Sequence, residues 1–138
     1  MARPPSQYPT GLELEILKIL WRDGESPVRH VRDALAPLRD PAYTSVMTTM
    51  NIMRKKGYLK RRRAGKSFLY SPLVSEQATS RGMLSDLVER VFDGSARALM
   101  VNLLEAEGIG GAEIAELRAL INEKARDAAK GRAKGVGK

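Results

Sequence analysis

The distribution of charge divides this chain into two parts. Residues 1–72 contain 14 Lys and Arg against 6 Asp and Glu, whereas residues 73–138 contain 10 of each, so the first part carries the whole net charge of +8. Eight of the cations, and no acid, fall within residues 54–66. A basic module beside a neutral one is typical of nucleic-acid-binding proteins that have a separate assembly domain. We therefore expect two structural modules with different roles.

Three helical patterns open the basic part. Thr10 and Glu13 form a capping-box pattern ahead of an apolar stripe, and Gly24 is suited to end this first helix. Ser26-Pro27 is a start signal for a second helix, with serine as the N-cap. A third helix is predicted from about residue 43 to residue 56. The buried face of the second helix is expected to consist of four apolar residues: Val28, Val31, Leu35 and Leu38.

Two short strands follow the third helix. Residues 58–63 and 67–70 flank the turn-like stretch Ala64-Gly65-Lys66, and Pro72 ends the hairpin. Three helices followed by a basic hairpin are the plan of a winged helix-turn-helix domain. We assign residues 10–73 to this domain and residues 1–9, which are rich in proline, to a flexible N-terminal arm.

The third helix has two chemically different faces. At about 100° per residue, Val46, Thr49, Met50 and Met53 share one side, which is expected to pack on the first two helices. The opposite side carries short polar side chains that can lie flush with base edges, since Thr and Asn bond to bases directly. The residues on this opposite side are Thr44, Thr48, Asn51 and Lys55, with Met47 beside them.

The cations around the hairpin are predicted to hold phosphates. Arg61, Arg62, Arg63 and Lys66 lie on the hairpin itself and are suited to phosphates or to a minor groove. A second group lies at the end of the third helix, where positive charge also complements the helix dipole, so this group has a structural explanation as well. This second group consists of Arg54, Lys55 and Lys56.

The neutral part is predicted to be helical and to dimerise. Residues 74–128 show three amphipathic helical patterns, separated by breaks at 93–95 and 108–111. Three short helices cannot bury all of their apolar faces alone, and a second copy of the chain is the simplest cover. The residues expected at this contact are Leu84, Leu87, Val91, Leu99, Leu103, Leu117 and Ile121. Residues 129–138 are expected to form a disordered basic tail.

Composition argues against several other classes of protein. The chain has no cysteine and one histidine, His30, so we expect no metal site, no cofactor and no catalytic dyad. It has no apolar run long enough to span a bilayer and no secretory signal pattern, so we expect a cytoplasmic protein without direct membrane insertion. The expected fold is mainly α, and the expected function is binding.

Several segments together carry a resemblance to a known family. They are an apolar stripe ending in Trp21, the run from Thr48 through Lys55-Lys56-Gly57-Tyr58-Leu59, and the strand leading into Pro72. Residues 99–105 and 113–117 extend the pattern. With these segments in order, the chain resembles the BlaI/MecI-type penicillinase repressors over roughly residues 8–124.

The resemblance implies a homodimeric winged-helix repressor of β-lactamase or related resistance genes. It implies binding to a palindromic operator, and it adds Ser45 and Met47 to the expected base contacts. It also implies derepression through a membrane sensor-protease that triggers cleavage in the dimerisation domain, which by position falls at Asn102-Leu103 in this chain.

Two other readings of the sequence stay open. One is a winged-helix regulator that responds to a small molecule bound between the domains, although the C-terminal helical segment has Phe92 as its one aromatic residue. The other is a nucleic-acid-binding protein without sequence preference, which the high charge and the Gly/Lys tail allow.

Overall fold

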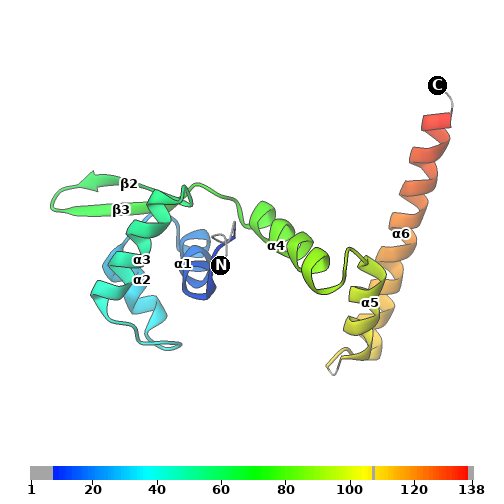
Figure 1. The fold of residues 1–138 in the computed structure, drawn as a ribbon, viewed down its shortest axis with the longest axis horizontal. Coiled ribbons are helices and arrows are strands. Elements are labelled where there is room, and N and C mark those ends of the chain that lie inside the picture. The colour runs from blue at the N-terminus through cyan, green and yellow to red at the C-terminus, as the bar shows by residue number, and fades with distance from the viewer. Residues whose placement is uncertain (1–7, 107, 137–138) are drawn as a thin grey trace, which may run out of the picture. The chain divides into compact units, whose positions relative to one another are not determined.

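The computed structural model describes the backbone of residues 8–106 and 108–136, and the side chains of these residues as far as residue 131. The described chain folds into helices and a small sheet that lie in two compact units, residues 1–87 and residues 88–138 (Figure 1). The elements in chain order are α1 (Gly11–Asp23), β1 (Ser26–Pro27), α2 (Val28–Leu35), α3 (Tyr43–Lys55), β2 (Leu59–Ala64), β3 (Ser67–Pro72), α4 (Glu76–Val91), α5 (Ala96–Glu105) and α6 (Gly111–Val136).

The core of the first unit lies between α1, α2, α3 and the sheet. The predicted inner side of α3 is confirmed, because Val46, Met50 and Met53 are fully buried. They pack in one cluster with apolar residues that recur at helical spacing on α1 and α2. The other core residues of this cluster are Ile16, Leu17, Ile19, Leu20, Val28, Val31, Leu35, Leu59 and Tyr70.

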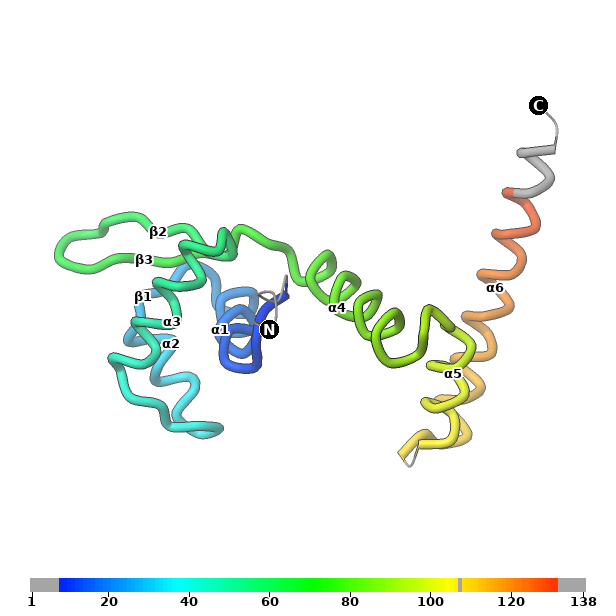
Figure 2. The backbone as a smooth tube through the Cα atoms, viewed as in Figure 1, coloured from blue at the N-terminus to red at the C-terminus, as the bar shows by residue number. Residues whose placement is uncertain are grey.

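The sheet has three antiparallel strands in the order β1-β3-β2. In the β2–β3 hairpin, Leu59 opposes Pro72 and Ala64 opposes Ser67, so Gly65 and Lys66 form the turn. Gly65 has a φ of 63°, a left-handed conformation that glycine adopts at little cost. The hairpin extends beyond α1, α2 and α3 (Figure 2), and most residues in the outer half of its strands are exposed.

The start of the second helix differs from the prediction. Ser26 and Pro27 form β1, which pairs with Tyr70 and Leu69 of β3. The hydroxyl of Ser26 donates to the carbonyl of Gly24 at 2.8 Å and so does not cap a helix. The N-cap of α2 is Pro27 in an extended conformation. Pairing with β3 satisfies the backbone at this point, and the helix begins one residue later than expected.

The prediction that Leu38 is a core residue is also wrong. Its side chain is 77% exposed, whereas the other three predicted apolar residues of α2 are buried. The helix ends at Leu35 and the chain turns over residues 36–39. Leu38 therefore leaves the helical register that would have carried it inward, and Asp40 follows with a φ of 45°.

The first unit extends beyond the boundary expected at residue 73, into α4. Ser75 caps α4 by accepting a hydrogen bond from the amide of Ala78 at 3.1 Å. The indole of Trp21 donates to the carbonyl of Val74 at 2.9 Å, which ties α1 to the chain entering α4. Residues 1–7 of the predicted flexible arm lie outside the described residues, but Pro9 is buried, so the prediction is wrong at that residue.

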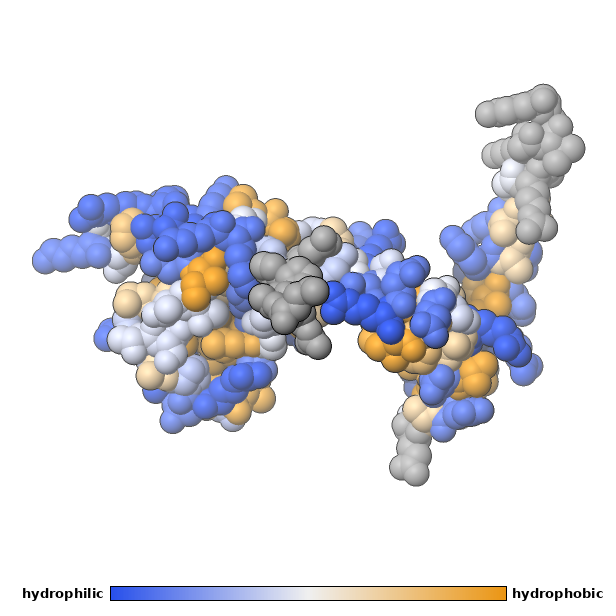
Figure 3. All heavy atoms as spheres, in the orientation of Figure 1, coloured by the Kyte–Doolittle hydropathy of each residue, from blue (hydrophilic) through white to orange (hydrophobic). Residues whose placement is uncertain are grey.

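The second unit contains the end of α4, α5 and α6, and none of its described side chains is buried. The hydroxyl of Ser95 caps α5 by accepting from the amide of Ala98 at 3.0 Å. Apolar atoms lie on the surface over α5 and the first part of α6 (Figure 3). Helices whose apolar side chains stay this exposed lack a core of their own within one chain.

The end of the chain differs from the prediction as well. A disordered tail was expected from residue 129, but α6 continues to Val136. Alanine, lysine and arginine make up most of this stretch and are good helix formers, and the helix continues through Gly131 and Gly135. Residues 137–138 lie outside the described residues.

Candidate nucleic-acid interface

The outer face of α3 presents the predicted base-contacting residues to solvent. Thr44, Ser45, Met47 and Thr48 are exposed, and Asn51 is half-buried. They face outward because the burial of Val46, Met50 and Met53 fixes the rotation of the helix. The hydroxyl of Thr49 donates to the carbonyl of Ser45 at 2.9 Å, so that threonine is engaged within the helix.

A cleft of about 510 Å³ separates α3 from the hairpin. Tyr43, Met47 and Asn51 line it from α3, while cations and aromatic rings line it from the other elements. The remaining lining residues are Pro27, Val28, Arg29, Arg61, Lys66, Ser67, Phe68 and Tyr70. The structure therefore brings Met47 and Asn51 of the predicted base-contacting set to the same opening as the basic hairpin, whereas Thr44, Ser45 and Thr48 are not among its lining residues. Hydrophilic residues cover the hairpin in Figure 3.

Asn51 lies at the centre of a polar network. Its carboxamide Oδ1 accepts from the Nε of Arg54 at 3.3 Å and from an Nη of Arg61 at 3.4 Å. The same Arg61 nitrogen lies 3.4 Å from the Tyr70 hydroxyl, and its guanidinium stacks 4.2 Å from the centre of the Phe68 ring. Both arginines were predicted to hold phosphates, yet here they have partners within the domain.

Arg62 also has a partner within the chain. Its guanidinium donates to both carboxylate oxygens of Glu25, at distances from 2.6 to 3.0 Å. The hydrogen bond from Arg62 holds the pKa of Glu25 below its ordinary value, and the carboxylate raises the pKa of Arg62. An arginine neutralised in this way is less available to a phosphate than sequence reasoning assumed.

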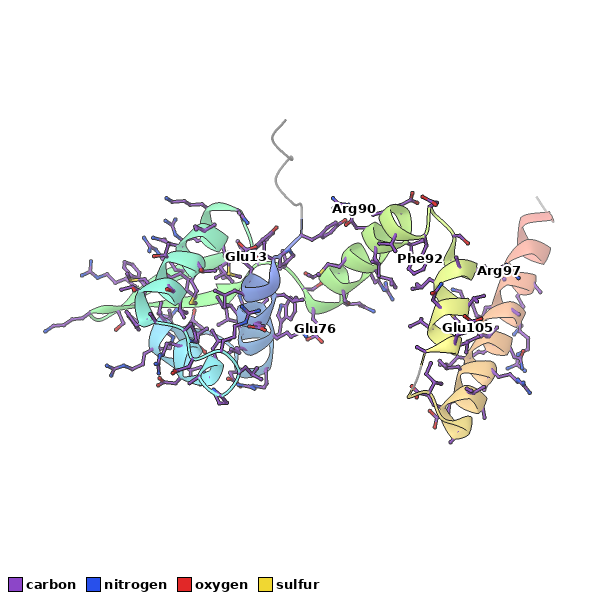
Figure 4. All side chains as sticks on the ribbon, turned by 60° about the horizontal axis from the view of Figure 1, so that its bottom comes forward. Glu13, Glu76, Arg90, Phe92, Arg97 and Glu105 are labelled. Carbon is purple, nitrogen blue, oxygen red and sulfur yellow. The ribbon has the colours of Figure 1, made fainter. Side chains whose placement is uncertain are left out.

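Lys56 has a structural role that the sequence did not show. Its Nζ lies 2.9 Å from a carboxylate oxygen of Glu13, whose side chain is only 4% exposed at the start of α1 (Figure 4). The other oxygen of Glu13 accepts from the amide of Thr10 at 2.9 Å, which confirms that half of the capping box. Burial by itself raises the pKa of Glu13, but the bonds from Thr10 and Lys56 outweigh it and lower the pKa overall.

A different set of cations is left for phosphates. Lys55, Lys60 and Lys66 are exposed and make no ion pair within the described part of the chain, and Arg63 donates only to the carbonyl of Gly65. Arg29, at the start of α2, lines the same cleft as Lys66. Sequence reasoning missed Arg29 and Lys60. Lys60 belongs to the basic run and was detectable, whereas the position of Arg29 depends on how α2 meets the hairpin.

The predicted dimer residues lie on the later helices. Leu84 and Leu87 of α4 are exposed, Val91 is 60% exposed at the end of that helix, and Leu99 of α5 is half-buried. Leu103 is exposed on α5, Leu117 is half-buried on α6 and Ile121 is exposed there.

The predicted cleavage pair lies in α5. Asn102 is exposed, its amide donates to the carbonyl of Ala98 at 2.8 Å, and Leu103 is exposed beside it. The pair lies in the second half of this helix, which Arg97 and Glu105 mark near its two ends in Figure 4.

Features of other site types are absent from the described residues. No group of three or more His, Cys, Asp or Glu there lies close enough to hold a metal ion. His30 bonds to Asp23 at 2.8 Å on the surface. None of the described helices is long and apolar enough to cross a membrane.

The sequence of the chain matches the profile of a known family over residues 9–123. This family is that of the penicillinase repressors. The chain belongs to the penicillinase repressor family. The match confirms the resemblance predicted from the sequence. The structure confirms the predicted fold, which is a winged-helix domain followed by helices.

Other members of the penicillinase repressor family show how far the similarity extends. The methicillin resistance regulatory protein MecI of Mammaliicoccus sciuri is 27% identical over 112 residues, which cover 81% of this chain and 91% of MecI. The transcriptional regulator BlaI of Mycobacterium tuberculosis is 32% identical over 115 residues, which cover 78% of this chain and 83% of that protein. A solution structure of the Bacillus licheniformis BlaI monomer in complex with the blaP half-operator aligns with this structure at a TM-score of 0.45 and 25% sequence identity. The alignment covers 56% of this chain and 92% of the BlaI chain.

Proposed function

We propose that this protein is a transcriptional repressor that binds operator DNA and controls genes of the β-lactamase or antibiotic-resistance type. Membership of the penicillinase repressor family is the observation that carries this proposal. The exposed polar face of α3 supports it, because that face stands beside a basic hairpin that projects from the same unit.

We infer from the geometry that one set of side chains contacts the bases and another contacts the phosphates. The short side chains of Thr44, Ser45 and Thr48 would approach base edges in the major groove, with the Met47 side chain in apolar contact. The phosphates on either side of these bases would be held by cations that have no ion pair among the described residues. These cations are Lys55, Lys60, Arg63, Lys66 and Arg29. Phosphate contacts set the position of a protein on the duplex, while base contacts set its sequence preference.

A dimer would place two such units on one operator. The exposed apolar residues of α5 and α6, which include Leu103 at 47% and Ile121 at 53% exposure, are the surface proposed to meet a second copy. A two-fold dimer binds two half-sites of a palindrome, about one helical turn or a multiple of it apart. Each protomer then raises the effective concentration of the other at its half-site.

Cleavage would release the operator by ending this coupling. A cut at Asn102-Leu103 by a membrane sensor-protease system would separate Leu99 from Leu103 on the same helix. The interface would lose its continuous apolar stripe, and each monomer would keep contact with only one half-site. The affinity gained through multivalency would then be lost.

Selection from random duplex DNA tests the proposal. The purified protein is incubated with the pool, and bound duplexes are amplified and sequenced over several rounds. A two-fold motif that is enriched by the full chain supports an operator-binding repressor. A Thr48→Ala variant is expected to relax one position per half-site, and Lys18→Ala, on α1 away from this face, serves as the control. An unenriched pool would overturn the proposal in favour of binding without sequence preference.

A further inference from the structure

The orientation of the Asn51 carboxamide is set by charge. Two guanidinium groups, those of Arg54 and Arg61, face the same side-chain atom from 3.3 and 3.4 Å. A guanidinium only donates hydrogen bonds, so an amide oxygen satisfies it and an amide NH2 group would oppose it. The oxygen of Asn51 therefore points toward the arginines, and its NH2 group is left for an external partner.

Arg61 is held in place by the hairpin. It opposes Tyr70 across the β2–β3 ladder, and Tyr70 is only 2% exposed. The Tyr70 hydroxyl lies 3.4 Å from the Arg61 Nη, and the Phe68 ring stacks on the guanidinium at 4.2 Å. A ring face attracts a cation, so these contacts keep the arginine over the cleft and pointed at Asn51.

This arrangement limits what Asn51 can recognise. The paired contact of asparagine with adenine needs the side-chain oxygen to accept from the adenine N6 amino group while the NH2 group donates to N7. Here the side-chain oxygen of Asn51 already accepts hydrogen bonds from Arg54 and Arg61, so it does not accept one from adenine. Guanine presents two acceptors, N7 and O6, at the same edge, which match an NH2 group with two donors.

We propose that Arg61 is a positioning residue that turns Asn51 into a donor-only reader, so that the protein prefers guanine over adenine at the base pair that Asn51 contacts. This inference rests on the proposed function, because it concerns the same face of α3. It assigns to Arg61 a role in specificity instead of the phosphate contact expected from its place in the basic run.

The test compares base preferences, because lost affinity alone would also follow from the loss of any cation. Selections are run in parallel with the full-length protein and with Asn51→Ala, Arg61→Met and Arg63→Met. Arg63→Met is the matched control, since it removes the same charge from the same strand and Arg63 does not contact Asn51. Preferences are then measured by competition between duplexes that differ at one base pair.

The parent protein is expected to prefer guanine over adenine at one position per half-site by at least about fivefold, a modest share of what a good paired contact provides. Asn51→Ala should reduce that preference to less than about twofold. Arg61→Met should lower it at the same position, with Arg54 still facing the oxygen. Arg63→Met should weaken binding to all duplexes and keep the preference. Arg61→Lys, which returns a cation to face the oxygen, should restore most of it.

Three results would overturn the inference. One is an unchanged guanine preference in Arg61→Met. Another is a parent preference for adenine at the position sensitive to Asn51→Ala. The third is an equal loss of preference in Arg63→Met. If thermal melting shows that Arg61→Met is unfolded, Arg61→Ala, which also has no side-chain donor, replaces it in the same comparison. In each of these cases an enriched two-fold motif leaves the proposed function standing, whereas no enrichment by the parent protein refutes the proposed function itself.

Discussion

Replacing Lys56 by methionine is expected to destabilise the first unit, whereas the same change at Lys55 should affect only DNA binding. The two lysines are neighbours with the same charge, but Lys56 is paired with buried Glu13 and Lys55 is exposed without an ion pair among the described residues. Methionine keeps most of the side-chain length and removes only the charge and its donors. The pair of variants therefore isolates the buried contact.

The size of the effect follows from what Glu13 loses. Leaving a buried acceptor without its partner costs about 1–3 kcal/mol. Glu13 keeps its bond from the Thr10 amide, and Lys56 is 35% exposed, so we take the lower part of that range, about 1–2 kcal/mol. For a domain of this size the Tm should fall by about 4–16 °C. Lys55→Met should change the stability by less than about 0.5 kcal/mol.

The loss should depend on pH with a defined sign. The pKa of Glu13 in the folded protein lies below its ordinary value of 4.5. A depressed carboxyl pKa contributes stability that is fully present above the unfolded value and is lost as pH falls through the folded value. The difference in Tm between the parent protein and Lys56→Met should therefore be largest above pH 4.5 and shrink at lower pH.

The assays are thermal unfolding followed by circular dichroism, and DNA binding measured over a range of salt concentrations. Lys55→Met should lower the slope of log affinity against log salt by about 0.9 in magnitude, while Lys56→Met should leave it unchanged. Equal loss of stability in both variants would refute the assignment of Lys56 to the buried pair. So would a reduced salt slope in Lys56→Met without any change in Tm.

Four further changes test other parts of the molecule. Glu25→Gln should free Arg62 for a phosphate and steepen the salt slope by about 0.9, so an unchanged slope in salt titrations would contradict the proposed competition. Thr48→Ala should cost about 1–3 kcal/mol on a selected operator and little on random DNA, as measured by competition binding. Leu103→Asp should abolish dimers at micromolar concentration in sedimentation experiments while the first unit stays folded, and a persistent dimer would exclude this residue from the interface. Met50→Ala should lower the free energy of unfolding by about 2–5 kcal/mol in denaturant titrations, because the side chain is fully buried.

Much of the fold could be predicted because the signals are local. Helical spacing of apolar residues located α1, α3 and the inner face of α3, and Gly65 marked the turn of the hairpin. The errors arose where distant contacts replaced local preference. Ser26 carries a good capping signal, yet it pairs with Tyr70 of β3, 44 positions further along the chain. Leu38 continues an apolar pattern, but α2 ends before reaching it.

The candidate site was predicted in position and only partly in chemistry. Composition and periodicity were enough to predict a short polar face on α3, a basic hairpin after it, and later helices with uncovered apolar residues. Which of the cations lack a partner within the described residues depends on the folded arrangement of the chain. Lys56 meets Glu13 across 43 positions, Arg62 meets Glu25 across 37, and Arg61 reaches Asn51 from the neighbouring strand. Ion pairs of this kind depend on which side chains the folded backbone brings within a few ångströms, so the same row of basic letters contains both structural and DNA-facing residues.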